Sequence, residues 1–272
     1  MHLKLSPSPL SHKEQLLYLY LESMDKNTFK VSELNLKKIG LAASYLYVLV
    51  NRLEKKGWIK GVGKGVYLRL PASTAMEGKV YLEDPMEVAL KMFKGYIAFQ
   101  SALKVHGLSE YEPFTIYVAT KEKSETIPLL KHYEIKAVKL GRRYTGFETS
   151  GKYTVSTIAK TFFDCFHNPQ YSGGYPEILK SLYSAENMDW KEMEKHLEKF
   201  GSSSMCQKIG YMLSLFKETE FEQPHDFIDY LKSRIKNKTK LDFSQSGGEY
   251  NKEWMIVDNI GKKNLLSWWY NG

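Results

Sequence analysis

Five polar residues lie close together in the first quarter of the chain and could contact nucleic-acid bases. They are Ser44, Tyr45, Tyr47, Asn51 and Arg52. An asparagine side chain can donate to and accept from one adenine, and an arginine can bind guanine or a phosphate group. Lys60 and Lys64 follow, and lysine ammonium groups bind phosphate oxygens without selecting a base sequence. These residue types predict a DNA-binding surface, with an ordinary solvated helix face as the alternative interpretation.

An apolar stripe at helical spacing positions the five residues. The stripe consists of Leu46, Leu49, Val50 and Leu53. Their i, i+3, i+4 and i+7 spacing predicts a helix that buries the stripe and turns the polar residues toward solvent. Lys55 and Lys56 suit the negative end of the helix dipole, and Gly57 can adopt the left-handed conformation that ends a helix.

A glycine-rich hairpin is predicted directly after this helix. Trp58 and Ile59 begin its first strand, and residues 61–65 have the turn sequence Gly-Val-Gly-Lys-Gly. Apolar and polar residues then alternate over 66–70, as in a half-buried return strand. A phosphate-binding glycine loop needs a helix after the turn. Because a strand follows here, the sequence excludes that loop.

Two shorter helices are predicted before this segment. Ser11 can cap the first helix, and the second follows Val31 and continues to Ile39, before a turn at Gly40. Three helices followed by a hairpin are typical of a winged helix-turn-helix, which places one helix in the major groove of DNA. We assign residues 1–74 to this DNA-binding domain and its hairpin to the wing.

The positive charge is concentrated in this predicted domain. The net charge of the chain is +8, and residues 1–80 hold thirteen Lys and Arg against six Asp and Glu, an excess of seven. A basic surface attracts DNA, RNA and acidic membranes alike, so the groove-binding motif is what favours double-stranded DNA. No apolar run approaches the roughly 18 residues of a membrane helix, and no signal peptide is evident. We expect a cytoplasmic protein without a membrane partner.

The remaining chain alternates helical and strand patterns, which predicts an α+β (mixed α/β) fold. Residues 71–78 are rich in small residues and predict a linker. Residues 75–186 are expected to form an α/β effector domain, and residues 187–272 a mainly helical C-terminal extension packed on it. Within the effector domain, a strand at 152–155 leads into a helix that Ser156 can cap.

The sequence contains no recognisable catalytic motif. HExxH, GxSxG, the Walker lysine motif and zinc-ligand spacings are missing from it. Cys165 and Cys206 form no CxxC pair and are expected to be buried apolar residues. His106 lies on an apolar helix face and Asp164 among aromatic residues, so both are expected to make structural hydrogen bonds. We expect no enzymatic activity, no metal site and no cofactor.

Several segments resemble the AbiEi family of antitoxins, the transcriptional regulators of type IV toxin–antitoxin systems used in defence against phage. Residues 101–108 and the strand 116–120 are similar to the start of the family's effector region. Residues 154–165 match its strand-to-helix motif, although the family more often has arginine at the position of Lys160. The resemblance covers nearly the whole chain. It continues through residues 56–67, Gly173-Gly174, Ile209-Gly210-Tyr211 and Trp254.

The resemblance implies two activities: repression of the protein's own operon through promoter repeats, and counteraction of a nucleotidyltransferase-like toxin. Either a monomer or a homodimer suits paired half-sites. The main alternative is a nucleic-acid-processing enzyme that docks its substrate on the winged helix. A third possibility is an adaptor that binds protein through this domain.

Two features near the C-terminus have two interpretations each. The basic run from Lys232 to Lys240 is either a second surface for nucleic acid or a toxin, or an ordinary solvated surface, which is the more common case. The aromatic tail Trp268-Trp269-Tyr270 either packs on the body of the protein or forms a dimer contact. Packing is favoured because three exposed aromatic residues would form a costly apolar patch.

Overall fold

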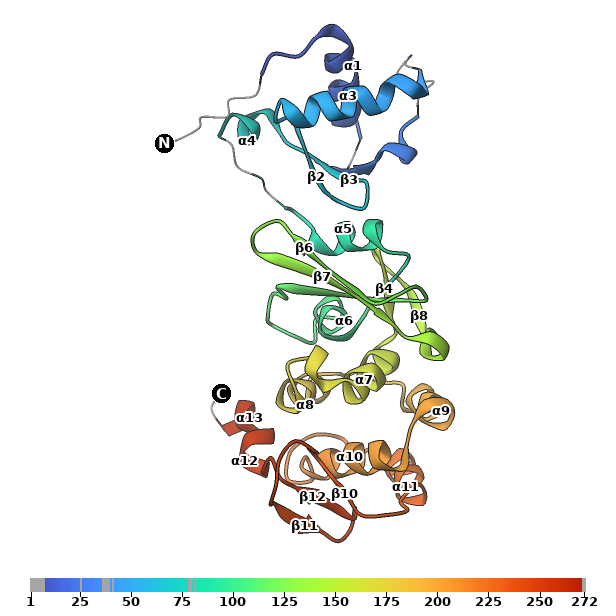
Figure 1. Cartoon of the computed structure of the whole chain (residues 1–272). Helices are drawn as coiled ribbons and strands as arrows, with labels where there is room; N and C mark the ends of the chain where they lie inside the picture. The colour runs from blue at the N-terminus through green and yellow to red at the C-terminus, as the bar shows by residue number, and fades with distance from the viewer. Residues whose placement is uncertain are drawn as a thin grey trace. The chain divides into compact units, whose positions relative to one another are not determined.

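A computed structural model describes residues 8–24, 26–35, 40, 42–77, 80 and 82–270 (Figure 1). The chain divides into two compact units. Unit 1 comprises residues 1–95, 114–118 and 122–137, and unit 2 comprises residues 96–113, 119–121 and 138–272. The fold class is mixed α and β, as the sequence predicts.

The first part of unit 1 combines helices with a three-stranded sheet. Helix α1 spans His12–Glu22, and helix α3 spans Ala43–Lys55. Strands β1 (Thr28–Lys30), β3 (Val66–Arg69) and β2 (Ile59–Gly63) pair antiparallel in that order. The helix and the glycine-rich hairpin expected from the sequence are both present. One apolar core joins these elements and includes Leu17, Phe29, Leu49, Leu53 and Ile59.

The predicted second helix is described only in part. Val31–Glu33 form a single 3-10 turn, η1, and residues 36–39 lie outside the described residues. Ser11 precedes α1 as predicted, and its backbone N–H donates to Glu14 Oε2 at 2.7 Å. This bond satisfies the backbone donor that precedes the helix.

Residues 72–77 of the predicted linker form a helix. Ala72–Glu77 is the short helix α4, and its Ala75 is buried and donates its N–H to the Pro71 carbonyl at 2.9 Å. Alanine has the highest helix propensity, and proline is common where helices begin. The small residues that indicated a linker therefore also favour a helix when tertiary packing buries one of them.

Unit 1 also contains helix α5 and part of a larger sheet. Helix α5 (Pro85–Met92) begins after Asp84, whose carboxylate accepts from the N–H groups of Met86 and Glu87 at 3.0 Å each. Helix α5 packs against β1 and β3. Strands β6 (Glu125–Leu129) and β7 (Tyr133–Lys139) form an antiparallel hairpin, and β5 (Thr115–Thr120) begins in this unit.

Unit 2 is built around helix α7. Strands β4 (Gly95–Ile97), β9 (Tyr153–Ser156) and β8 (Phe147–Ser150) are neighbours in that order, with β4 parallel to β9 and β8 antiparallel to it. In the chain, helix α6 (Phe99–Val105) follows β4. Helices α7 (Ile158–His167) and α8 (Tyr175–Tyr183) follow β9. The predicted strand-to-helix motif at 154–165 corresponds to β9 and α7.

The residue that caps α7 is Thr157, so the expectation of Ser156 was wrong. Thr157 Oγ1 accepts from the Lys160 N–H at 3.2 Å. Ser156 instead ends β9, and its buried hydroxyl lies 2.6 Å from the hydroxyl of Thr161. A capping residue stands immediately before the first helical residue. Because β9 continues through Ser156 and α7 begins at Ile158, the capping position is Thr157.

The C-terminal part of unit 2 contains three longer helices and a small sheet. The helices are α9 (Trp190–Phe200), α10 (Ser203–Ser214) and α11 (His225–Ser233). The sheet has the order β10 (Thr239–Lys240), β12 (Ile256–Asp258), β11 (Glu249–Asn251). Helix α10 packs against β10 and β12 (Figure 1). Of these strands the sequence predicted only the one at 254–257, since β10 and β11 are too short to show an alternating pattern.

The aromatic tail packs within unit 2. Two short helices, α12 (Lys262–Leu265) and α13 (Ser267–Tyr270), end the described chain. The ring of Trp268 lies 5.4 Å from that of Tyr183, and the ring of Trp269 lies 5.1 Å from it. These contacts support the packing interpretation. In the basic run, Lys232 pairs with Glu253 at 3.2 Å, and both side chains remain partly exposed.

One predicted domain boundary falls inside a helix, and the other falls between two helices. The boundary between residues 74 and 75 lies within α4, and the boundary between residues 186 and 187 lies between α8 and α9 of unit 2. The division into three domains stays a prediction. Every helix in the described part of the chain is too short or too polar to cross a lipid bilayer.

The close packing of α10 on Trp254 leads to a stability prediction. A Cβ atom on Gly210 would overlap the six-membered ring of Trp254, which is 1% exposed. Alanine would improve helix propensity by about 1 kcal/mol, but overpacking a core costs about 1–3 kcal/mol. The cost lies at the upper end of this range because the added Cβ would fall within a rigid, buried ring. We therefore expect Gly210→Ala to lower the free energy of unfolding by about 2 kcal/mol after the gain in propensity, measured by urea denaturation.

The paired control for this prediction is Trp254→Phe. Phenylalanine lacks the part of the indole that occupies the space beside Gly210, so Gly210→Ala should cost less in that background. An equal cost in both backgrounds would show that contact with Trp254 is not the cause.

Candidate nucleic-acid interface and buried polar cluster

Helix α3 has one buried and one exposed face. The buried face consists of Leu46, Leu49, Val50 and Leu53, none more than 2% exposed. The opposite face exposes Ser44, Tyr47, Asn51 and Arg52, and the Tyr47 side chain is 66% exposed. The structure therefore brings four of the five predicted contact residues of α3 together on one solvent-facing surface.

Tyr45 differs from the expectation of a fully exposed tyrosine. It is half-buried and packs against the core of unit 1. Its hydroxyl accepts a hydrogen bond from Arg52 Nη1 at 3.1 Å, and the Lys13 ammonium lies 5.0 Å from the centre of its ring. Tyr45 therefore holds two cations beside the exposed face of α3, through a hydrogen bond and a cation–π contact.

Val48 belongs to the exposed face although the sequence interpretation omitted it. It is 41% exposed and lies one helical turn from both Ser44 and Asn51. An exposed apolar side chain among polar ones on a helix can contact the methyl group of thymine. Its spacing from Ser44 and Asn51 was the signal that could have identified it.

The N-terminus of α3 is free of negative charge. No acidic residue lies in its first turn, and Ala42, which precedes the helix, has no side chain that can accept a hydrogen bond. The first N–H groups of such a helix keep their partial positive charge. This end of α3 therefore favours an anion over a cation.

The hairpin turn places Lys64 against another part of unit 1. Lys64 has a φ of 47°, between two glycines that also have positive φ. Its ammonium lies 2.8 Å from Glu125 Oε2 of β6 and 4.3 Å from the centre of the Phe93 ring. The hydrogen bond from Lys64 lowers the pKa of the Glu125 carboxyl. The charge of Lys64 is therefore compensated within unit 1.

Lys60 has a different environment, although it lies in the same hairpin. It is exposed, and it forms no ion pair with any residue that the structure describes. The backbone N–H of its neighbour Gly61 donates to Glu54 Oε1 of α3 at 2.8 Å, so β2 lies beside the second half of α3. Of the two predicted wing lysines, Lys60 is the one whose charge is not paired with any described residue.

Other basic residues of unit 1 stabilise the fold. The Lys56 ammonium lies 2.6 Å from Glu14 Oε2, and Glu14 is 1% exposed. Burial alone would raise the pKa of Glu14, but hydrogen bonds from Lys56 and Ser11 outweigh burial and lower it. The positive charge of the N-terminal region is thus partly used inside the unit, and Arg52, Lys55 and Lys60 remain on its exposed surface.

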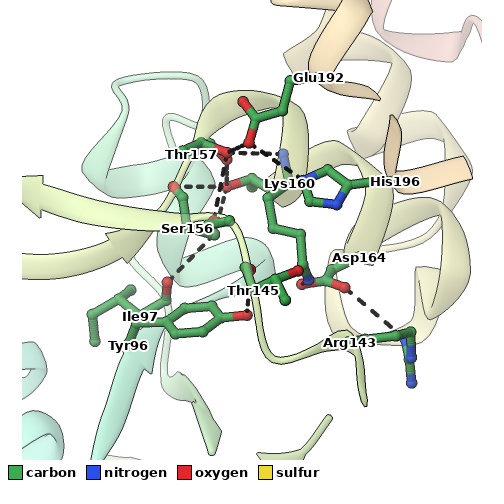
Figure 2. Close-up of polar contacts among 12 residues, drawn as sticks. Tyr96, Ile97, Arg143, Thr145, Ser156, Thr157, Lys160, Asp164, Glu192 and His196 are labelled. Carbon is green, nitrogen blue, oxygen red and sulfur yellow. Dashed lines mark hydrogen bonds and ion pairs between the residues drawn. The ribbon is translucent and has the colours of Figure 1, made fainter. Parts of the chain in front are cut away.

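Helix α7 of unit 2 contains a buried ion pair (Figure 2). The Lys160 ammonium donates to the Asp164 carboxylate one turn further along α7, and both side chains are 0% exposed. The guanidinium of Arg143, on the turn Gly141–Arg143, lies 3.9 Å from the other carboxylate oxygen of Asp164. Asp164 is therefore an acceptor, as expected, but its partner is a buried lysine.

A network of hydroxyl groups surrounds the start of α7. The Thr157 hydroxyl donates to Glu192 Oε1 of α9 at 2.8 Å, and the same carboxylate oxygen lies 3.3 Å from His196 Nε2 (Figure 2). The buried Tyr96 hydroxyl donates to the Thr145 carbonyl at 3.3 Å. These contacts join β4, the loop before β8, and helices α7 and α9 around the ion pair.

Burial shifts the pKa of three groups in this cluster. Desolvation lowers the pKa of Lys160 and raises the pKa of Asp164. Desolvation also lowers the pKa of His196, and the positive charge of Lys160 adds to this effect. Removal from water disfavours a charge whatever its sign, so the pair is retained only because each charge faces its partner.

The remaining candidate residues have structural environments. His106 Nε2 lies 2.7 Å from the Ser156 carbonyl, which is the structural hydrogen bond that we expected. Cys165 and Cys206 are free thiols and buried, as expected. Burial raises the pKa of Cys165 to about 12 and that of Cys206 to about 11. Among the described residues, no group of three or more His, Cys, Asp and Glu side chains is placed to hold a metal ion.

Comparisons with known proteins show a likeness at the level of the fold. No protein-family model matches the sequence, and no curated protein matches it. The chain is similar to the crystal structure of the Rv2827c protein from Mycobacterium tuberculosis, with 13% sequence identity and a TM-score of 0.68 over 97% of both chains. At this identity the likeness concerns the fold alone.

The buried ion pair leads to a prediction about stability. Lys160→Met leaves the Asp164 carboxylate buried without its main partner, which costs about 3–5 kcal/mol when a buried pair is broken. We expect a loss of this size in the free energy of unfolding, measured by urea denaturation with circular dichroism. Lys160→Met combined with Asp164→Leu removes both charges and should recover most of the loss. If the double variant is no more stable than the single one, the ion pair is not the reason for the loss.

Proposed function

We propose that unit 1 contains a winged helix-turn-helix and that the protein is a sequence-specific regulator that binds double-stranded DNA in the cytoplasm. The observation that carries this proposal is the exposed face of α3. It combines hydrogen-bonding side chains, an exposed tyrosine and an arginine on one surface. Helices that enter the major groove present this combination of residue types to base edges and phosphates.

Three features of unit 1 support the placement of α3 in the groove. The order of helices and strands from α1 to β3, with the sheet order β1-β3-β2, is compatible with a helix followed by a wing. The first turn of α3 has no acidic residue to repel a phosphate. Lys60 lies in the hairpin beside α3 and has an uncompensated charge.

The residues of the exposed face then have the following roles in binding DNA. Asn51 is the candidate for a paired hydrogen bond with adenine, and Val48 for contact with a thymine methyl group. Arg52, which Tyr45 holds in place, binds guanine or a phosphate. Ser44 and Tyr47 donate to phosphates or base edges, and Lys60 binds the DNA backbone.

The biological context of the proposal rests on the resemblance to the AbiEi antitoxins. The motifs at 101–108, 116–120 and 154–165 support a role in which the protein represses its own operon and counteracts a nucleotidyltransferase-like toxin. Lys160 lies in one of these motifs, and its buried ion pair explains why a long cationic side chain occurs there. An arginine at this position would still carry the charge that Asp164 requires.

DNA binding is tested with the upstream region of the gene, by fluorescence anisotropy against a scrambled duplex. Asn51→Ala should weaken binding to the specific duplex by about 1–3 kcal/mol, or roughly fivefold to 150-fold. It should leave binding to the scrambled duplex nearly unchanged. Equal affinity of the unchanged protein for both duplexes would contradict the proposal.

The two wing lysines provide a matched pair for the same assay. Lys60→Ala should weaken binding to both duplexes and reduce the slope of log K against log salt by about one. Lys64→Ala should have a smaller effect, because Glu125 already compensates the charge of Lys64. A larger effect for Lys64→Ala than for Lys60→Ala would show that the ion pair with Glu125 does not persist on DNA.

The antitoxin role is tested by co-expression with the downstream gene. A nucleotidyltransferase-like open reading frame should arrest growth when expressed alone, and this protein should restore growth. Asn51→Ala should restore growth as well, since it changes α3 and not the motifs at 101–165. Failure to restore growth would refute the antitoxin role, and metal-dependent turnover of DNA or RNA by the purified protein would favour the enzyme instead.

A further inference from the structure

A cavity of about 670 Å³ in unit 2 is lined by aromatic and acidic residues. It is formed by residues between the end of α8 and the start of α9 and by residues between α10 and α11. The size is within the range of sites that bind small molecules. Its lining includes Tyr183, Glu186, Trp190, Glu220, Phe221 and Glu222.

Three aromatic side chains supply the walls of this cavity. The rings of Tyr183 and Phe221 stack with their centres 6.1 Å apart, at an interplanar angle of 29°. The Trp190 ring packs against Phe227, with centres 5.0 Å apart, which fixes its position. Aromatic faces attract organic cations through their quadrupole, and tryptophan does so most strongly.

Three carboxylates accompany the aromatic walls. Glu186, Glu220 and Glu222 are exposed, and none of them forms an ion pair with a described residue. The segments 183–190 and 220–224 contain no Lys or Arg, in a chain whose net charge is +8. The cavity is therefore a locally acidic site on a basic protein, and it attracts a ligand of positive charge.

The wall of the cavity also holds an unused hydrogen-bonding group. Both polar atoms of the Gln223 amide are buried and have no hydrogen-bond partner among the described residues. A buried amide without partners is rare, and it calls for a group that can donate or accept. The amide oxygen would accept from an ammonium group once the Gln223 side chain turns toward the cavity.

The spacing of the carboxylates distinguishes between kinds of cation. No three acidic or other ligating side chains in the described part of the chain lie close enough together to hold one metal ion. The three carboxylates are thus too dispersed for a single divalent ion, and they suit a ligand whose positive charges are themselves separated. The methylene groups of such a chain also suit the aromatic walls and Met188.

We propose that this cavity binds a linear aliphatic polyamine with two or three ammonium groups. The carboxylates of Glu186, Glu220 and Glu222 pair with the ammonium groups, and Trp190, Tyr183 and Phe221 contact the methylene chain and the cationic ends. The inference does not depend on DNA binding by unit 1, because it rests on residues of unit 2 alone.

The test is titration of the full-length protein with spermidine, followed by isothermal calorimetry and by tryptophan fluorescence. We expect saturable binding with one site per chain and a change in fluorescence from Trp190. Magnesium chloride at matched ionic strength should produce neither signal. The absence of saturable binding, or competition by magnesium as strong as spermidine binding itself, would overturn the proposal.

Matched variants separate a specific site from general charge. Glu186→Gln, Glu220→Gln and Glu222→Gln together should weaken spermidine binding about tenfold or more, since each exposed ion pair accounts for about two- to fivefold. The control changes three exposed glutamates away from the cavity: Glu148→Gln, Glu198→Gln and Glu249→Gln. It makes the same change in net charge and should leave binding within about twofold. Equal losses in the two triple variants would overturn the proposal.

Two substitutions of Trp190 test the contribution of the aromatic wall to spermidine binding. Trp190→Leu should weaken binding about two- to fivefold or more, and Trp190→Phe should weaken it less because a ring is retained. Thermal unfolding of each variant shows whether it folds. An unchanged affinity in a folded Trp190→Leu variant would rule out the aromatic wall as part of the site.

Discussion

The fold of unit 2 depends on the requirement that two buried charges compensate each other. Residues 159–166 of α7 are buried without interruption, so this helix has no solvent-facing side on which Lys160 or Asp164 could be hydrated. Their i, i+4 spacing places the two side chains on the same side of α7. The elements around the pair are arranged accordingly: Arg143 lies on the carboxylate side, and Thr157 and Glu192 link the start of α7 to α9.

Unit 1 distributes its charges in the opposite way. Its basic residues divide into those that pair with a carboxylate, such as Lys56 with Glu14 and Lys64 with Glu125, and those that remain on the exposed surface, such as Arg52 and Lys60. The basic residues of unit 1 therefore serve two purposes. Paired lysines hold the hairpin and the N-terminal segment in place, and the unpaired cations beside α3 are available to a polyanion.

A helix or turn was predictable from the sequence where the residues that determine it lie within that element. The buried stripe of α3 and the glycine turn at 61–65 follow from residue spacing and from the conformational freedom of glycine. The sequence was misleading where two structures share one signal. Small residues at 72–77 are compatible with a linker or a helix, and either Ser156 or Thr157 could cap α7. Strands of two or three residues, such as β1 and β10, exist only through their partners.

By itself the sequence determined the amphipathic helix, the hairpin and the positive charge of the N-terminal region, because helical period and turn chemistry act between near neighbours. Only the tertiary structure decided which charges remain free. Lys60 and Lys64 are alike in sequence, but Glu125, 61 residues beyond Lys64, compensates one of them. The tertiary structure also decided that Glu186 and Glu222, from separate segments, share one cavity. Such partners depend on the path of the folded chain, which no local pattern encodes.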